Sequence, residues 1–239
     1  MKKKKWKKVW IGICIVFMLT GCGNYQENKV EYVRKEEDFF NRQKEMEQYL
    51  ICKYGNLSYE VTGVIWRFWN QRYDQMNLSI EKNGHKEMCW VRRYERDGTV
   101  SFTESYFGLQ IREEYEKRMK EKADTIFNHV KVFSFTENTE FSENVDRYDG
   151  LEEAREKGEK IRVISWMFVS GIRKDQLGTL TRRFYEAWKK EQMESLVSVF
   201  LVDEEEFFQI SRINAGIFIK ERRYKAQDVC YVKDERGEL

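Results

Sequence analysis

The sequence predicts an α+β fold: an antiparallel β-meander with flanking helices, followed by a smaller part with the order β-α-β-α-β. Two dipeptides, Asn83-Gly84 and Asp97-Gly98, separate runs in which apolar and polar residues alternate. Such dipeptides favour the tight turns of β-hairpins. After residue 150, apolar residues recur at helical spacing between the predicted strands, which favours helices packed on a small sheet.

The larger part is expected to span residues 36–136. Its meander covers roughly 75–107, because Met76, Leu78 and Ile80 alternate with polar residues just before the first turn dipeptide. The helices are predicted over 36–54, which ends at Gly55, and over 108–127, and the other strands over 59–68 and 130–135. The polar and acidic stretch 136–150 is the best candidate for an internal boundary.

The smaller part is expected to span residues 150–239. Asp203 with Glu206 three residues later resembles a capping box, which would open a short helix running through Ile210. The other helices are predicted over 151–157 and 174–192, and the strands over 161–169, 196–202 and 229–232.

The first 21 residues have the three-part pattern of a secretory signal. Six lysines and no acids occupy residues 1–8, and the 11 residues from Val9 to Leu19 are almost wholly apolar. A membrane-spanning helix needs roughly 20 apolar residues, so this run suits export better than permanent insertion.

The signal ends in Leu19-Thr20-Gly21-Cys22, which resembles the lipobox of bacterial lipoproteins. The resemblance implies that a diacylglyceryl group is attached to the Cys22 thiol and that a peptidase cuts just before Cys22. Two acyl chains give lasting membrane attachment, so the expected location is the extracytoplasmic face of the cell membrane. Residues 22–35, polar and unpatterned, would then be a lipidated tether. The alternative is a plain signal peptide or a short transmembrane anchor.

The order of the predicted elements is similar to that of a group of Gram-positive surface lipoproteins of unknown function. These proteins have a lipobox, a short tether, a helix, an antiparallel sheet and a helix, and then a second α/β part. The resemblance implies a fold and a location at the cell surface, and it implies no activity.

The charge of the chain excludes a typical nucleic-acid-binding surface. Without the six lysines of the signal, the 43 basic residues fall to 37, against 41 acidic residues, so the net charge is −4. Besides Cys22, the mature chain has Cys52, Cys89 and Cys230, which fit either unpaired thiols or one disulfide and a spare. Cys52 falls off the apolar stripe of its helix and is expected to be exposed.

No motif points to catalysis, a metal or a cofactor. His85 and Cys89 are four residues apart on a predicted strand, roughly 13 Å, which is too far to share a metal ion. The acidic run from Asp203 to Glu206 lacks the alternating ligands of a calcium loop, and a helix start explains it better. We therefore expect no cofactor and no metal site.

Aromatic side chains are the candidate ligand-binding residues. Trp66, Trp69, Tyr73 and Trp90 cluster around the first sheet, where flat rings in a groove would suit sugars. The alternative is that these rings belong to the core. Trp69 and Tyr73 lie in a polar turn and are the least explained by packing.

Together these features predict a membrane-anchored extracytoplasmic lipoprotein that acts as a non-catalytic binding module, with a protein or cell-wall glycan as partner. Two alternatives remain open: an extracytoplasmic hydrolase that uses carboxylates, and a small solute-binding lipoprotein.

Overall fold

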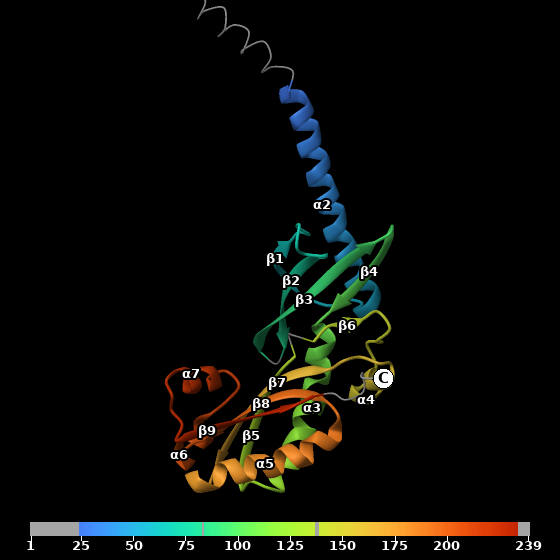
Figure 1. Cartoon of the computed structure of the whole chain (residues 1–239). Helices are drawn as coiled ribbons and strands as arrows, with labels where there is room; N and C mark the ends of the chain where they lie inside the picture. The colour runs from blue at the N-terminus through green and yellow to red at the C-terminus, as the bar shows by residue number, and fades with distance from the viewer. Residues whose placement is uncertain (1–23, 83, 137–138, 234–239) are drawn as a thin grey trace, which may run out of the picture. The chain divides into compact units, whose positions relative to one another are not determined.

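The computed structural model describes residues 24–82, 84–136 and 139–233 (Figure 1). The signal 1–21 and Cys22 lie outside these residues. The strands are β1 (Glu60–Ile65), β2 (Tyr73–Lys82), β3 (His85–Arg96), β4 (Thr99–Glu104), β5 (His129–Phe135), β6 (Phe141–Ser142), β7 (Arg162–Ser170), β8 (Glu194–Leu201) and β9 (Ala226–Val232). The helices are α2 (Asn24–Tyr54), α3 (Tyr106–Asp124), α4 (Leu151–Glu156), α5 (Leu177–Trp188), α6 (Glu204–Gln209) and α7 (Ala215–Lys220), with 3-10 turns at Lys174–Gln176 and Lys189–Glu191.

The chain divides into two compact units between Tyr49 and Leu50, and the second unit holds both sheets. Helix α2 begins at Asn24, so residues 24–35, expected as a tether, are helical. Its 31 residues correspond to a helix of about 46 Å. The first turns of α2 carry no apolar stripe, so the spacing of apolar residues in the sequence did not predict that they are helical. The helix ends where expected, at Gly55, whose φ of +70° suits a residue without a Cβ.

The first sheet is antiparallel, with the strand order β1-β2-β3-β4-β6. Both predicted hairpins are confirmed, since Lys82 pairs with His85 and Arg96 pairs with Thr99. Asp97 and Gly98 have φ values of +52° and +77°, the left-handed pair that a two-residue type I′ turn requires.

The second sheet is mixed, with the order β5-β7-β8-β9. Strands β7 and β8 are parallel and are connected through α5, while β5 and β9 pair antiparallel with their neighbours. The α+β class is therefore confirmed. The stretch 136–150, expected as a boundary, follows β5, which joins the second sheet, and itself contains β6, which joins the first.

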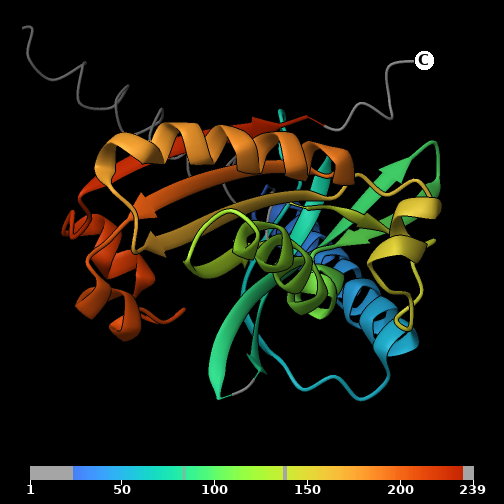
Figure 2. The same ribbon diagram turned by 90° about the horizontal axis from the view of Figure 1, so that it is seen from below.

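Helices α3 and α5 cover one face of the second sheet, and Figure 2 shows α5 lying along it. The main core forms here and includes Tyr115, Phe184 and Trp188, each fully buried. The opposite face packs against α6 and α7 through a second cluster that contains Phe168, Phe200, Phe207 and Phe218. Strands β5, β7 and β8 contribute side chains to both clusters, as the two-residue period of a strand allows, whereas β9 contributes only to the first.

The main core also contains polar groups that hydrogen-bond to one another. The Tyr115 hydroxyl lies 2.7 Å from Ser195 Oγ, and Trp188 Nε1 donates to the same oxygen at 3.0 Å. Ser195 Oγ in turn donates to the Met193 carbonyl at 2.9 Å. Because each of these buried groups has a partner, the ring systems can lie fully buried without an unsatisfied donor.

Glu104 connects three elements of the second unit. Its side chain is fully buried and accepts hydrogen bonds from Lys53 Nζ at 3.2 Å and from the Tyr54 hydroxyl at 2.6 Å, both at the end of α2. Its other oxygen accepts the Phe107 N–H at 2.9 Å, at the start of α3. One carboxylate therefore holds β4 and two helix ends together.

The predicted capping box at Asp203 does not form. Helix α6 begins at Glu204 as expected, but Asp203 makes no side-chain capping hydrogen bond. The Asp203 carboxylate instead pairs with Lys225, and Glu206 pairs with Arg223 at 3.0 Å. Both cations lie between α7 and β9, so the tertiary fold brings in partners that the local spacing does not indicate.

Candidate functional site

The loop between β1 and β2, residues 66–72, presents large aromatic side chains to solvent, and we call it the aromatic loop. The Trp69 side chain is 96% exposed and Phe68 is 71% exposed. Ile65, the last residue of β1, is 47% exposed. Most large apolar groups in folded proteins are covered, so adjacent bare rings indicate a contact surface.

Hydrogen bonds hold the base of the aromatic loop in place. The Arg67 N–H donates to Asp74 Oδ1 at 2.7 Å, and the Gln71 N–H donates to the Phe68 carbonyl at 2.9 Å. The Gln71 side chain donates to the Tyr73 carbonyl at 2.8 Å. The loop is thus a fixed turn that exposes Phe68 and Trp69 between two anchored ends.

Charged groups behind the aromatic loop add to this support. Asp74 is fully buried on β2 and lies 3.7 Å from the Arg93 guanidinium, which lies 3.0 Å from Glu95. Glu95 also lies 3.5 Å from Arg67. The loop is therefore tied through charges to two neighbouring strands.

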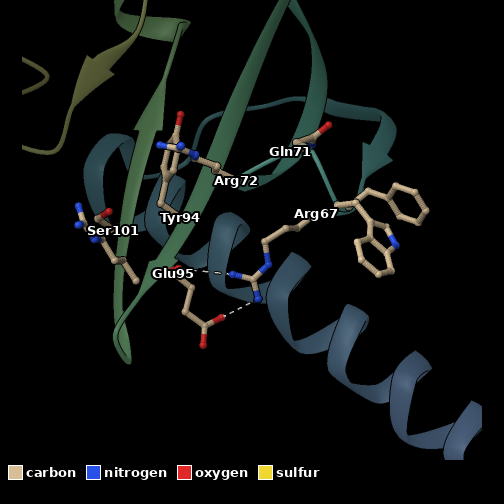
Figure 3. Close-up of a pocket in the computed structure, with 9 residues that line it drawn as sticks. Arg67, Gln71, Arg72, Tyr94, Glu95 and Ser101 are labelled. Carbon is tan, nitrogen blue, oxygen red and sulfur yellow. Dashed lines mark hydrogen bonds and ion pairs between the residues drawn. The ribbon is translucent and has the colours of Figure 1, made fainter.

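An open depression of about 1080 Å³ lies beside the aromatic loop (Figure 3). It is lined by residues of the loop and of β3 and β4, namely Arg67, Phe68, Trp69, Gln71, Arg72, Tyr94, Glu95, Arg96 and Ser101. Three arginines and one glutamate give this lining a positive charge. We call the depression, with the loop, the aromatic–arginine site.

The three arginines differ in how far they are engaged. Arg67 pairs with Glu95, as the dashed lines in Figure 3 show. Arg96 lies 3.8 Å from Asp97, but both side chains are more than 90% exposed, and such a pair contributes little. Arg72 has no ion pair within the part of the chain that the structure describes. Its guanidinium is available to bind a phosphate or carboxylate through two parallel hydrogen bonds.

The predicted site residues occupy three different environments. Trp69 lines the depression, whereas Trp66 is half-buried outside the lining. Tyr73 is also half-buried, and its ring packs 5.4 Å from the ring of Tyr94, which does line the depression. The guanidinium of Arg92 lies 4.3 Å from the Tyr73 ring, so Tyr73 belongs to the sheet surface behind the site.

Sequence reasoning missed the arginines and Phe68. Arg67 and Phe68 fall at the end of the strand predicted over 59–68, but β1 ends at Ile65 and both residues lie in the loop. Arg96 comes from β3, 27 positions after Trp69 in the chain, and only the pairing of β2 with β3 brings it near.

The Tyr94 hydroxyl donates a hydrogen bond to Glu140, which lies outside the lining of the depression. Burial, together with its hydrogen bond to Glu140, raises the pKa of Tyr94 to about 12. The phenol therefore keeps its proton at physiological pH and does not act as a general base.

The two buried thiols, Cys89 and Cys230, are also unsuited to nucleophilic chemistry. Burial, with the nearby Glu104 charge, raises the pKa of Cys89 to about 12, and burial beside Asp228 raises the pKa of Cys230 to about 12. These two thiols lie on β3 and β9 and form no disulfide, and Cys52 is exposed as predicted. A reactive cysteine needs a lowered pKa, so Cys89 and Cys230 have the opposite character.

Carboxyl groups with shifted pKa values are held by cations. Burial alone would raise the pKa of Glu87, but the hydrogen bond and charge of Arg112 outweigh burial and lower it. No three His, Cys, Asp or Glu side chains converge as metal ligands in the described ranges. Among the helices that the structure describes, none is both long enough and apolar enough to cross a bilayer.

Comparison of the chain with protein-family models, curated proteins and solved structures finds no match in any of the three.

Proposed function

We propose that this chain is a membrane-anchored extracytoplasmic binding module without catalytic activity, held in the membrane by a diacylglyceryl group on Cys22. Its ligand-contact surface is the aromatic–arginine site. The observation that carries the proposal is Trp69: a large apolar ring, 96% exposed, on a loop whose base is fixed by Asp74 and Gln71.

The composition of the site supports recognition. Tryptophan, arginine and tyrosine dominate the residues that contribute most to binding at protein surfaces. A loop that is already ordered loses little conformational entropy when it binds. The site holds one carboxylate, Glu95, whose neighbours are Arg67 and Arg93, so its polar groups suit binding better than proton transfer.

The test is photo-crosslinking in intact cells. A photoreactive phenylalanine such as p-benzoylphenylalanine replaces Trp69 in one variant and Tyr148 in a matched control. Tyr148 is 78% exposed and lies outside the depression. We expect an adduct from position 69 that is absent from position 148. Equal labelling at both positions, or none at either, would contradict the proposed contact surface.

The anchor is tested separately on the full chain. The Cys22→Ser variant should lack the acyl mass that the parent carries. It should also remain unprocessed, because lipidation precedes cleavage in the family that the lipobox resembles. If the mass of the parent protein shows no acyl adduct, the proposed anchor is contradicted. The proposed binding site does not depend on this result.

A further inference from the structure

We infer that the aromatic–arginine site is a second membrane attachment, which docks residues 50–239 on a bilayer surface rich in anionic lipids. This inference rests on the proposed anchor and names the ligand class of the proposed site. Phe68 and Trp69 enter the interfacial region of the bilayer, and Arg72 and Arg96 contact lipid phosphates.

The exposure of the two rings distinguishes a bilayer from a sugar. A sugar site places a ring along the wall of a cleft and surrounds the ligand with a few convergent polar groups. Trp69, at 96% exposed, has both faces bare, and its neighbour Phe68 is 71% exposed. Exposed tryptophan beside another exposed apolar ring is typical of proteins that contact the membrane–water interface.

The charges around the rings match an anionic headgroup layer. Arg67, Arg72 and Arg96 line the depression with Glu95 as the single acid, and Asp97 beside Arg96 is fully in solvent. Basic residues at a membrane surface are attracted by anionic lipids, and this attraction is screened by salt. Ile65, at 47% exposed, extends the apolar surface from the loop onto the end of β1.

The proposed anchor makes a weak second attachment effective. The 26 residues of α2 from Asn24 to Tyr49 span about 39 Å, so the proposed anchor keeps residues 50–239 within a few nanometres of the bilayer. Linking two binding events makes the second one intramolecular, so it no longer depends on the concentration of the protein in bulk solution. A site with modest affinity of its own is then occupied, and it fixes the orientation of the anchored unit.

The experiment uses residues 23–239, which contain every described helix and strand and lack the acyl group. Flotation measures binding to vesicles of phosphatidylglycerol and phosphatidylcholine in equal parts, and to vesicles of phosphatidylcholine alone. We expect binding to the anionic vesicles that weakens at high salt. The F68S/W69S double variant should lose at least about tenfold in partitioning, and R72Q about fivefold.

Two controls locate the contact. Tyr148→Ser removes another exposed aromatic ring, which lies outside the depression, and should leave partitioning unchanged. Trp69→Phe keeps an apolar ring and should bind within about twofold of the parent. Brominated acyl chains should quench the tryptophan emission of the parent but not that of Trp69→Phe. This difference would place position 69 inside the bilayer. All variants should keep the parent's thermal transition, because the substituted side chains are exposed.

Three results would overturn the inference. One is the absence of binding to anionic vesicles; another is binding that F68S/W69S leaves intact. The third is full competition by soluble glycerol phosphate, which would show that the site takes the phosphate group alone. If crosslinking from position 69 in cells yields a protein or glycan adduct while vesicle binding fails, the bilayer is excluded and the proposed binding module stands. If position 69 yields no crosslinked adduct and the protein does not bind vesicles, the membrane inference and the proposed binding module are both contradicted.

Discussion

Two tryptophans of the second unit have opposite environments. Trp188, at the end of α5, is fully buried, stacks with Phe184 at 6.2 Å and donates its N–H to Ser195 Oγ at 3.0 Å. Trp69, in the aromatic loop, is 96% exposed. The fold supplies the first ring with packing on every side and a hydrogen-bond acceptor. It supplies the second only with a fixed backbone.

The difference shows how stability and recognition are separated in this molecule. Burial of an aromatic side chain contributes to the free energy of folding, whereas a bare ring contributes when a partner covers it. The fixed base of the aromatic loop, through Asp74 and Gln71, holds the bare ring in place. Substitutions at the two tryptophans should therefore affect different measurements.

The largest expected effect is at the buried ring. Trp188→Ala should lower the free energy of unfolding by about 3–5 kcal/mol, because it removes a core ring and leaves a cavity. Chemical denaturation measures the loss. Trp188→Phe keeps a ring and removes only the N–H, so its loss should be smaller. Equal losses for the two variants would mean that the hydrogen bond to Ser195, and not packing, gives Trp188 its role.

The next effect is at the carboxylate that ties α2, β4 and α3 together. Glu104→Gln should cost about 3 kcal/mol, because Lys53, only 9% exposed, loses its buried counter-charge. Glu113→Gln is the matched control: its ion pair with Lys82 is 3.5 Å long and its side chain is 65% exposed. A surface pair of this kind contributes less than about 1 kcal/mol. A control loss as large as that of Glu104→Gln would contradict the role given to burial.

A smaller and pH-dependent effect is expected between β3 and α3. Glu87 accepts a hydrogen bond from Arg112 at 2.6 Å, and Arg212 and Lys82 add to the positive charge around it. Its pKa is lower in the folded state than in the unfolded state. The stability that it contributes is therefore present above its ordinary pKa and is lost as the pH falls through the folded value.

Glu87→Gln tests this sign. The variant should be about 1.5 kcal/mol less stable than the parent at neutral pH, because a charged hydrogen bond is replaced by a neutral one. The difference should shrink as the pH is lowered through the acid range in which Glu87 protonates. Denaturation curves of both proteins across that range measure it. A difference that grows in acid would mean that the folded-state pKa is raised.

The smallest effect on stability is expected at the exposed ring. Trp69→Ala should change the free energy of unfolding by less than about 0.5 kcal/mol, because the side chain has almost no contacts to lose. Binding of the ligand or bilayer should fall instead. A thermal melt beside the flotation assay separates the two. A loss of several kcal/mol would show that Trp69 is a structural residue and would end the comparison with Trp188.

Local signals predicted a large share of this fold. Asp97-Gly98 strongly favours two left-handed residues through local torsion preferences, so the second hairpin could be located from the sequence. Gly55 ends α2 for the same backbone reason. The polar turn around Trp69 also indicated a ring that packing did not explain, and that ring is bare.

Non-local pairing was beyond the reach of these signals. β5 precedes the polar stretch 136–150, yet it pairs with β7, while the two-residue strand β6 pairs with β4. Strand partners are chosen by burial across the whole unit, and a two-residue strand has no readable period. For the same reason, the sequence did not predict that Arg96 belongs to the candidate site. Arg96 lies near the aromatic loop only because β2 and β3 pair.

By itself, the sequence determined the backbone features that a few neighbouring residues enforce: both hairpin turns, the end of α2 and the period of each long element. It also predicts the lipid anchor at Cys22, which lies outside the described residues. Only the tertiary structure decided which strands share a sheet, that Trp188 is enclosed and Trp69 bare, and that arginines from β3 and the aromatic loop line one depression. Turn conformation depends on torsion angles within a few residues, whereas burial and convergence depend on contacts between segments far apart in the chain.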